Sequence, residues 1–245
     1  MKIIGIIPAR FSSSRFPGKM LADINGKTMI KRVYEQCSKS EHLSEIIIAT
    51  DDARIKSECE SFGANVIMTK PEHPSGTDRC YEAYTILNKK YDFVLNIQGD
   101  EPFIKPEQID NLISNLNLET ELSTLIKKIE DESILWNTGN VKVAFNTRME
   151  ALYFSRQVIP FVRGIEQKDW MKSFDFYEHV GLYAYRTDVL EEICKLKTST
   201  LEDAESLEQL RWLENGYKIK LQPTKWDSFC IETPEDLDIA IQNYC

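Results

Sequence analysis

The chain has 245 residues with a formal net charge of −9, and 42% of the residues are hydrophobic. This length can bury a sizeable core and often forms one α/β domain, so we expect residues 1–245 to form a single domain. The acidic balance argues against binding of nucleic-acid polymers, which need a broad basic face. No apolar run reaches the roughly 18 residues that span a membrane, and no signal-type segment opens the chain, so we expect a cytoplasmic protein outside the membrane.

The first predicted element is a buried strand over residues 2–8, a continuous apolar run rich in β-branched residues. Pro8 and Pro17 interrupt regular structure on either side of the loop that follows it. Apolar residues then return at helical spacing after Gly26, at Met29, Ile30, Val33, Tyr34 and Cys37. A strand, a loop and a helix in this order open an α/β nucleotide-binding unit, whose ligand lies beyond the carboxyl ends of the strands.

The loop after the first strand carries three cations, Arg10, Arg15 and Lys19, in an otherwise acidic chain. A polyphosphate would explain them, because main-chain N–H groups of Ser and Gly form an anion-binding concavity and the side chains supply the countercharge. The alternative is a solvated connection with incidental cations. Residues 26–28 end like a Walker A loop but lack its first glycine, and no G-x-G-x-x-G occurs, so neither motif is supported.

The remaining predicted elements alternate between strands and helices. We predict strands at residues 45–50, 65–68, 91–97, 141–145, 183–185 and 218–222, and helices at residues 53–62, 79–88, 106–115 and 201–214. This order predicts a largely parallel sheet with helices on both faces. Residues 155–175 are less regular and could form a lid or an excursion used in an oligomer.

The predicted strand at residues 91–97 delivers a carboxylate, Asp100, just beyond its carboxyl end. Gly99 permits a close approach of the backbone at this point. Mg²⁺ takes oxygen ligands and usually keeps water and substrate phosphates in its shell, so Asp100 is a candidate metal ligand. The alternative is an ordinary turn or helix cap.

The turn at residues 72–79 leads into a helix, for which Thr77 or Asp78 is the expected cap. In the functional interpretation, backbone and short polar groups of this turn also bind the edge of a nucleobase. His73 alone is weak support for it, because a single His beside a Pro is usually a surface or turn residue.

A strand at residues 178–186 would place His179, Gly181, Tyr183 and Tyr185 on one face. A polar face with two aromatic rings suits a sugar, and it equally suits a strand with one solvated face. The amphipathic helical segment at residues 205–211 would ordinarily present its charges to solvent.

Near the C-terminus, Thr233 is predicted to cap a helix that has Pro234 at its first position and Asp236 at its third. Glu232 lies just outside this cap. The six cysteines are scattered without C-x-x-C spacing, and the three histidines are far apart, so no zinc pattern is present. We expect reduced thiols.

Together these motifs resemble the CMP-KDO synthetase family, the cytidylyltransferases that activate 3-deoxy-D-manno-octulosonate (KDO). The matching motifs follow the family's order over almost the whole chain, at residues 7–10, 14–15, 17–19, 49–51, 75–79, 98–102, 153–156, 179–181 and 207–211. The first motif alone would also fit CMP-sialate synthetases and more distant nucleotidyltransferases. The combination with His179, Tyr183 and residues 207–211 is similar to the KDO enzymes in particular.

The resemblance implies a three-layer α/β/α nucleotidyltransferase fold that is Rossmann-like, with a mostly parallel central sheet, a small dimerisation excursion and a homodimeric state. It also implies a Mg²⁺-requiring transfer of CMP from CTP to KDO that feeds lipopolysaccharide assembly. The alternatives are a related sugar acid, such as 8-amino-KDO or a sialate-like acid, and a nucleotide-binding module without turnover. Retention of Lys19 and Asp100 argues against the last alternative.

The residue roles that the resemblance implies fall into four groups. Nucleotide binding is assigned to Ala9, Arg10, Arg15, Lys19, Ser75, Gly76, Thr77 and Arg79, and sugar-acid binding to Gln98, Arg156, His179, Tyr183, Glu208 and Gln209. Arg15, Lys19 and Asp100 are the catalytic residues, and Asp100 and Glu232 hold the metal. The family has Asp where this chain has Glu232, whose extra methylene moves the carboxylate outward.

Overall fold

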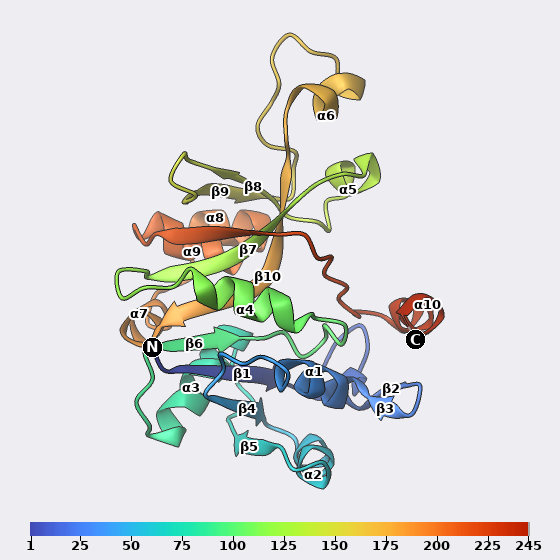
Figure 1. Ribbon diagram of the computed structural model, residues 1–245, viewed down its shortest axis with the longest axis vertical. Coiled ribbons are helices and arrows are strands. Elements are labelled where there is room, and N and C mark those ends of the chain that lie inside the picture. The colour runs from blue at the N-terminus through green and yellow to red at the C-terminus, as the bar shows by residue number, and fades with distance from the viewer. Residues whose placement is uncertain (245) are drawn as a thin grey trace.

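The computed structural model describes residues 1–244 and shows a mixed sheet with helices packed on both of its faces (Figure 1). The main path of this nine-stranded sheet runs in the order β11-β7-β10-β6-β1-β4-β5. Its strands are β1 (Ile3–Ala9), β4 (Glu45–Thr50), β5 (Asn65–Met68), β6 (Phe93–Asn96), β7 (Leu122–Lys128), β10 (Tyr177–Arg186) and β11 (Ile219–Thr224). Along this path only β10 runs antiparallel to its neighbours, so the predicted mostly parallel sheet is confirmed.

The alternation of side chains along β1 explains the three layers. Ile3 and Ile7 join a core with helices α1 (Met29–Cys37), α2 (Ala53–Ser61) and α4 (Pro106–Ser114). Ile4 and Ile6 join a second core with α3 (Gly76–Leu87), α7 (Thr187–Ile193) and α9 (Glu208–Glu214). Successive side chains of a strand point to opposite faces of the sheet, so one continuous apolar strand supports both helical layers. The three-layer α/β/α architecture is confirmed.

Two predicted helices differ in the structure. The helix expected at residues 201–214 is divided into α8 (Thr200–Glu205) and α9, because Ser206 adopts a left-handed conformation with φ 53° that ends α8. The helix expected from residue 79 begins at Gly76. Its cap is Ser75, whose hydroxyl accepts a hydrogen bond from the Asp78 N–H, so the predicted caps Thr77 and Asp78 are wrong.

Some strands were missed or predicted too short. Strand β10 extends over ten residues instead of three. Strand β7 escaped prediction because hydroxyl residues interrupt its apolar pattern, yet it lies inside the sheet. The Ser123 hydroxyl donates to the Lys220 carbonyl at 3.1 Å and the Thr124 hydroxyl to the Leu182 carbonyl at 2.8 Å, which satisfies these buried groups. Strands β8 (Lys142–Phe145) and β9 (Ala151–Ser155) pair beside β10, and β2 (Asp23–Ile24) and β3 (Lys27–Thr28) form a separate small sheet.

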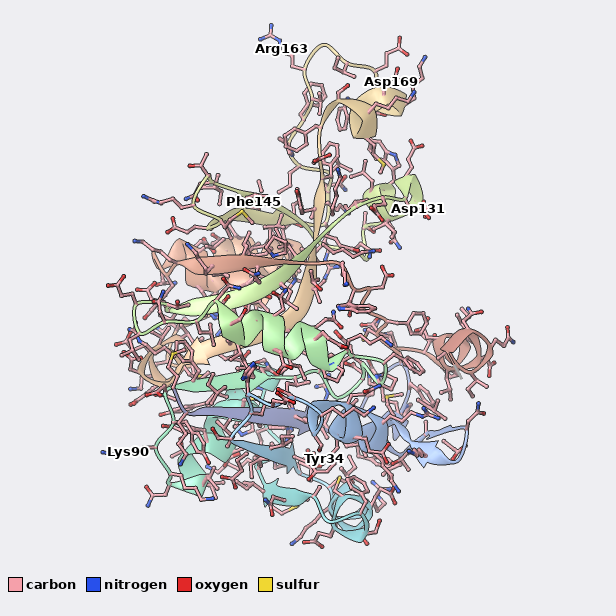
Figure 2. The ribbon with its side chains drawn as sticks, in the orientation of Figure 1. Tyr34, Lys90, Asp131, Phe145, Arg163 and Asp169 are labelled. Atoms are coloured by element: carbon pink, nitrogen blue, oxygen red, sulfur yellow. The ribbon has the colours of Figure 1, made fainter. Side chains whose placement is uncertain are left out.

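The segment between β9 and β10 projects away from the sheet at the top of Figure 1. It contains a short 3-10 helix, η2 (Gln167–Asp169), and α6 (Trp170–Ser173). Trp170 is buried at its base against Phe176 and residues around α5 (Glu132–Trp136), whereas Phe161 is exposed. Figure 2 shows Arg163 and Asp169 on this projection, far from Tyr34 and Lys90 of the main body. The predicted excursion is present, and its role in an oligomer stays a prediction.

The remaining helix, α10 (Pro234–Tyr244), begins as predicted, because the Thr233 hydroxyl accepts from the Asp236 N–H at 3.2 Å. Five cysteines, Cys37, Cys59, Cys80, Cys194 and Cys230, are free thiols, and Cys245 lies outside the described residues. Within residues 1–244, no helix has the length and apolar character that crossing a membrane requires.

Candidate functional site

A cleft opens beyond the carboxyl ends of β1 and β6, where the N-terminus of α3 also lies. Three of the segments singled out in the sequence meet there: the cationic loop, the Asp100 segment and the turn before α3. Glu232, which precedes the Thr233 cap of α10, also lies in this cleft. The lining residues are Pro8, Arg10, Ser13, Ser14, Arg15, Lys19, Met20, His73, Pro74, Ser75, Gly76, Arg79, Gln98, Gly99, Asp100 and Glu232.

The cationic loop leaves β1 directly after Ala9 and closes on itself at Gly18. The Gly18 N–H donates to the Phe11 carbonyl at 2.9 Å, and Gly18 has φ 74°, a conformation that favours glycine. A Cβ at this position would lie 3.0 Å from the Phe11 ring. This closure places Lys19 at the start of a short 3-10 helix, η1 (Lys19–Leu21), with its side chain directed into the cleft.

Two ion pairs connect this loop to the predicted metal carboxylates. Lys19 Nζ lies 2.5 Å from Asp100 Oδ2 and donates to the Ile231 carbonyl at 3.1 Å. Arg15 forms an ion pair with Glu232, and these two side chains are 62% and 43% exposed. The structure therefore brings together all the residues predicted for catalysis and for metal binding, and each cation faces one carboxylate.

Gly99 allows the Asp100 segment to pass close to β1. A Cβ on Gly99 would lie 2.9 Å from the Pro8 carbonyl oxygen, so a side chain here would displace the backbone. The Ile231 N–H donates to the Asp100 carbonyl at 2.9 Å and thereby ties the segment before α10 to it. This link holds Glu232 at the cleft.

Asp100 and Glu232 form a donor set that fits Mg²⁺. Within the described residues, no group of three or more His, Cys, Asp or Glu side chains could hold a metal ion. Mg²⁺ is commonly held by one or two carboxylates together with substrate phosphates and water. The two carboxylates and the adjacent cationic loop suit that arrangement.

The predicted nucleobase turn lines the opposite wall of the cleft. Ser75 and Gly76 start α3, and Arg79 on the next turn is buried with one edge in the cleft. Its Nη1 donates to the Thr69 hydroxyl at 2.6 Å, and its Nη2 lies 3.6 Å from Asp51. These contacts fix the guanidinium, so the wall is rigid at this point.

The residues predicted for the sugar acid lie mainly behind this cleft. Gln98 lines it and donates to the Gly181 carbonyl of β10 at 3.3 Å. Arg156 donates through Nε to the Glu205 carbonyl at 2.7 Å, at the junction of α8 and α9. Glu208 and Gln209 follow on α9, where Gln209 is buried and Glu208 is half-buried. The set converges on β10 and this junction.

The aromatic pair of β10 is packed instead of solvated. Tyr183 and Tyr185 are buried and stacked, with ring centroids 5.8 Å apart, and both rings meet Trp212 of α9 edge-on. The interpretation of this strand as having one solvated face is therefore wrong. His179 lies beside Tyr183 with its Nε2 3.0 Å from the Thr124 hydroxyl, and burial lowers its pKa to about 4.

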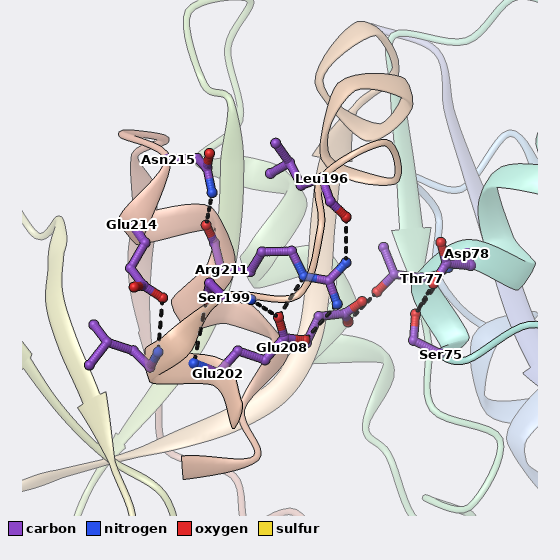
Figure 3. Close-up of polar contacts among 11 residues, drawn as sticks. Ser75, Thr77, Asp78, Leu196, Ser199, Glu202, Glu208, Arg211, Glu214 and Asn215 are labelled. Carbon is purple, nitrogen blue, oxygen red and sulfur yellow. Dashed lines mark hydrogen bonds and ion pairs between the residues drawn. The ribbon is translucent and has the colours of Figure 1, made fainter. Parts of the chain in front are cut away.

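The charges of residues 205–211 are not a solvated face either. Arg211 pairs with Glu202 of α8 through two hydrogen bonds of 2.5 and 2.7 Å, and both side chains are nearly buried (Figure 3). Burial raises the pKa of Glu208. The amphipathic pattern of this segment could not predict these contacts, because the groups that pair with its charges lie on other elements.

Two further residues at the site had no predicted role. Burial raises the pKa of Glu101 to about 7, and the neighbouring Asp100 charge adds to the shift. His73 lines the cleft, and its Nε2 lies 2.5 Å from Glu82, which also accepts from the Lys70 N–H at 2.8 Å. The available signal was their place in segments singled out in the sequence: Glu101 lies in the motif at residues 98–102, and His73 in the turn at residues 72–79.

Comparisons with known proteins agree with this geometry. Residues 4–219 match the family described as Cytidylyltransferase. The chain is 56% identical over 238 residues to a 3-deoxy-manno-octulosonate cytidylyltransferase of Cytophaga hutchinsonii, covering 97% of this chain and 95% of that protein. It is 53% identical over 246 residues to the enzyme of the same name from Parabacteroides distasonis, covering 98% and 97%. A solved structure of CMP:2-keto-3-deoxy-manno-octonic acid synthetase complexed with CTP superimposes with a TM-score of 0.91 and 38% identity, covering 99% of this chain and 98% of that one.

Proposed function

Because the chain belongs to the cytidylyltransferase family, we propose that it transfers CMP from CTP to KDO, releasing pyrophosphate and supplying CMP-KDO for lipopolysaccharide synthesis. The observation that carries this proposal is the full-length likeness to relatives of that name, together with a CTP-bound structure of the same shape. The cation-lined cleft supports it, because both substrates are anionic.

The chemistry is an in-line displacement at the α-phosphate of CTP. The anomeric hydroxyl of KDO forms a bond to the α-phosphorus while the bond to the bridging oxygen breaks and pyrophosphate leaves. The hydroxyl proton passes to solvent. Catalysis of phosphoryl transfer consists mostly of positioning and charge stabilisation. Lys19 and Arg15 neutralise the charge that develops on the leaving phosphates.

Asp100 and Glu232 would hold Mg²⁺ in this proposal, because such sites commonly use one or two carboxylates. Bound there, the metal supplies a Lewis acid that neutralises phosphate charge and favours the deprotonated hydroxyl. Lys19 and Arg15 face these carboxylates in the structure, so they exchange carboxylate contacts for phosphate contacts when substrate binds.

The nucleotide lies against Ala9, Arg10, Ser75, Gly76 and Arg79. The sugar acid is held by Gln98 and by the group Arg156, His179, Tyr183, Glu208 and Gln209. We further propose that residues 1–245 form one domain, that the protein works in the cytoplasm as a homodimer, and that the projection between β9 and β10 contributes to the dimer. Its exposed Phe161 is the support for the last point.

Pyrophosphate release tests the proposal. The full chain is incubated with CTP, Mg²⁺ and one of three acids: KDO, 8-amino-KDO or a sialate. KDO should give the highest kcat/KM, and ATP or GTP should be used far less well than CTP. Preference for another acid would reassign the substrate, and absence of release with all three would indicate a binding module. Equal use of all nucleotides would remove the assignment of residues 75–79 to the base.

A further inference from the structure

The side chain of Thr77 points in a different direction from those of Ser75 and Arg79. Ser75 and Arg79 are four residues apart at the start of α3, so they share the helix face that lines the cleft. Thr77 lies halfway between them and therefore points to the other side of the helix. It is 3% exposed. The motif is continuous in sequence, but its central side chain does not line the cleft.

The Thr77 hydroxyl instead reaches a group that is distant in the chain. Its Oγ1 donates to Glu208 Oε2 at 2.7 Å (Figure 3). The same oxygen lies 3.3 Å from the Tyr185 hydroxyl. The ring of Tyr185 is stacked on Tyr183, whose ring centroid lies 5.2 Å from that of His179. A single hydroxyl thus connects α3 to the residues of β10 and α9 proposed for the sugar acid.

Glu208 needs such a donor because its carboxylate is largely out of solvent. Burial raises its pKa, whereas hydrogen bonds from Thr77 and, to a smaller extent, from Ser75 lower it. Arg211 is close to Glu208, but its Nε and Nη2 both donate to Glu202 instead. A buried acceptor that loses a partner is destabilised by the desolvation cost of that group, so the 2.7 Å hydrogen bond from Thr77, the stronger of the two, favours the present position of this carboxylate.

We infer that Thr77 is a positioning residue for sugar-acid binding: it acts through Glu208 and does not contact the nucleotide. This inference rests on the proposed function, and it moves Thr77 from the nucleotide group to the sugar-acid group. It also makes the start of α3 a two-sided element, with CTP on the cleft face and the sugar-acid group on the buried face.

The test compares Thr77→Val, which removes the hydroxyl at nearly constant volume, with Thr77→Ser, which keeps it. Thr77→Val should lower kcat/KM for KDO about 10- to 100-fold, the scale of losing a hydrogen bond to a charged partner, and Thr77→Ser should recover most of it. The Kd for CTP, measured by calorimetry without KDO, should stay within about twofold. Thr85→Val is the matched control, since Thr85 is exposed on the same helix and bonds only to the Tyr81 carbonyl of that helix.

A double-mutant cycle with Glu208→Gln tests whether Thr77 acts through Glu208. If it does, Thr77→Val should add little to the loss already caused by Glu208→Gln, because coupled residues are not additive. Additive losses, or a CTP Kd that weakens while kcat/KM for KDO holds, would overturn the inference. Thr77→Ala replaces Thr77→Val if the latter does not fold. Failure of the proposed function is seen separately, as a wild-type chain that does not turn over KDO.

Discussion

The cationic loop at residues 10–19 and the helical pair α8–α9 both set an arginine against a glutamate, but at different depths. The Arg15–Glu232 side chains are 62% and 43% exposed, whereas those of Arg211 and Glu202 are 11% and 12% exposed. An exposed ion pair contributes about 0–1 kcal/mol, so a ligand can replace it. Breaking a buried pair costs about 3–5 kcal/mol, so that pair keeps its geometry when ligands come and go.

The Lys19–Asp100 pair lies between these extremes, with side chains 11% and 21% exposed. It faces the cleft, yet Lys19 is also held by the Ile231 carbonyl. The nucleotide end of the site is therefore built from charges that exchange partners. The sugar-acid end is built from packed polar groups, most of which are paired within the protein, whereas the buried Tyr183 hydroxyl has no hydrogen-bond partner among the described residues. Four predictions test this division.

The largest effect is expected at Lys19. Lys19→Ala should lower kcat by about 10²- to 10³-fold, the scale for removal of one donor that stabilises developing charge. Initial rates of pyrophosphate release at saturating CTP and KDO measure it. Lys27→Ala is the control, because Lys27 forms an exposed pair with Glu35 outside the cleft. A kcat within threefold of wild type would remove Lys19 from the mechanism.

Disruption of the buried Arg211–Glu202 pair should lower the free energy of unfolding. Glu202→Gln keeps the capping interaction of α8, because Gln also serves in a capping box, but it removes the carboxylate to which Arg211 donates two hydrogen bonds. The free energy of unfolding in urea should fall by about 3 kcal/mol. Glu191→Gln, in an exposed pair with Lys195, should change it by less than about 0.5 kcal/mol. Equal changes in the two variants would erase the distinction between buried and exposed pairs.

His179 should make the folded protein less stable as the pH falls. Its pKa in the folded protein is lowered to about 4 by burial, so the unfolded chain takes up a proton first as the pH falls below about 6.5. The unfolded state binds more protons in this range, and stability is lost on going from pH 6.5 to pH 5 by up to about 2 kcal/mol. His179→Gln should lose less stability over this interval than wild type, and His42→Gln, on the surface, should lose as much. Parallel curves for His179→Gln and wild type would show that His179 is not held neutral.

The smallest effect is expected at Glu232, where the side chain is most accessible to solvent among the proposed metal ligands. Glu232→Gln should raise the Mg²⁺ concentration for half-maximal rate about five- to tenfold, since the metal relies on one or two carboxylates. The KM for CTP should not rise, because Arg15 is released for phosphate. Glu235→Gln, at the second position of α10 and exposed, is the control. Superimposable Mg²⁺ titrations would leave Asp100 to act alone.

Local sequence patterns predicted the elements whose signals are local. The apolar run of β1, the loop with its three cations and the Thr233 cap of α10 each depend on residues within one or two turns of each other. The same patterns misjudged β7 and the helix at residues 201–214. In both cases the deciding feature was a partner or a backbone conformation outside the pattern: hydrogen bonds from Ser123 and Thr124 to other strands, and a left-handed Ser206.

The sequence by itself therefore determined the alternation of most strands and helices, the cationic loop and the presence of carboxylates at strand ends and before a capped helix. Tertiary structure decided which of these groups meet. Arg15 pairs with Glu232 from 217 positions away, and Thr77 with Glu208 from 131. Periodicity reports the face on which a side chain lies, but its partner and its depth depend on how distant elements pack. For that reason the partners of Thr77, Tyr183 and Glu202 became visible only in the folded protein.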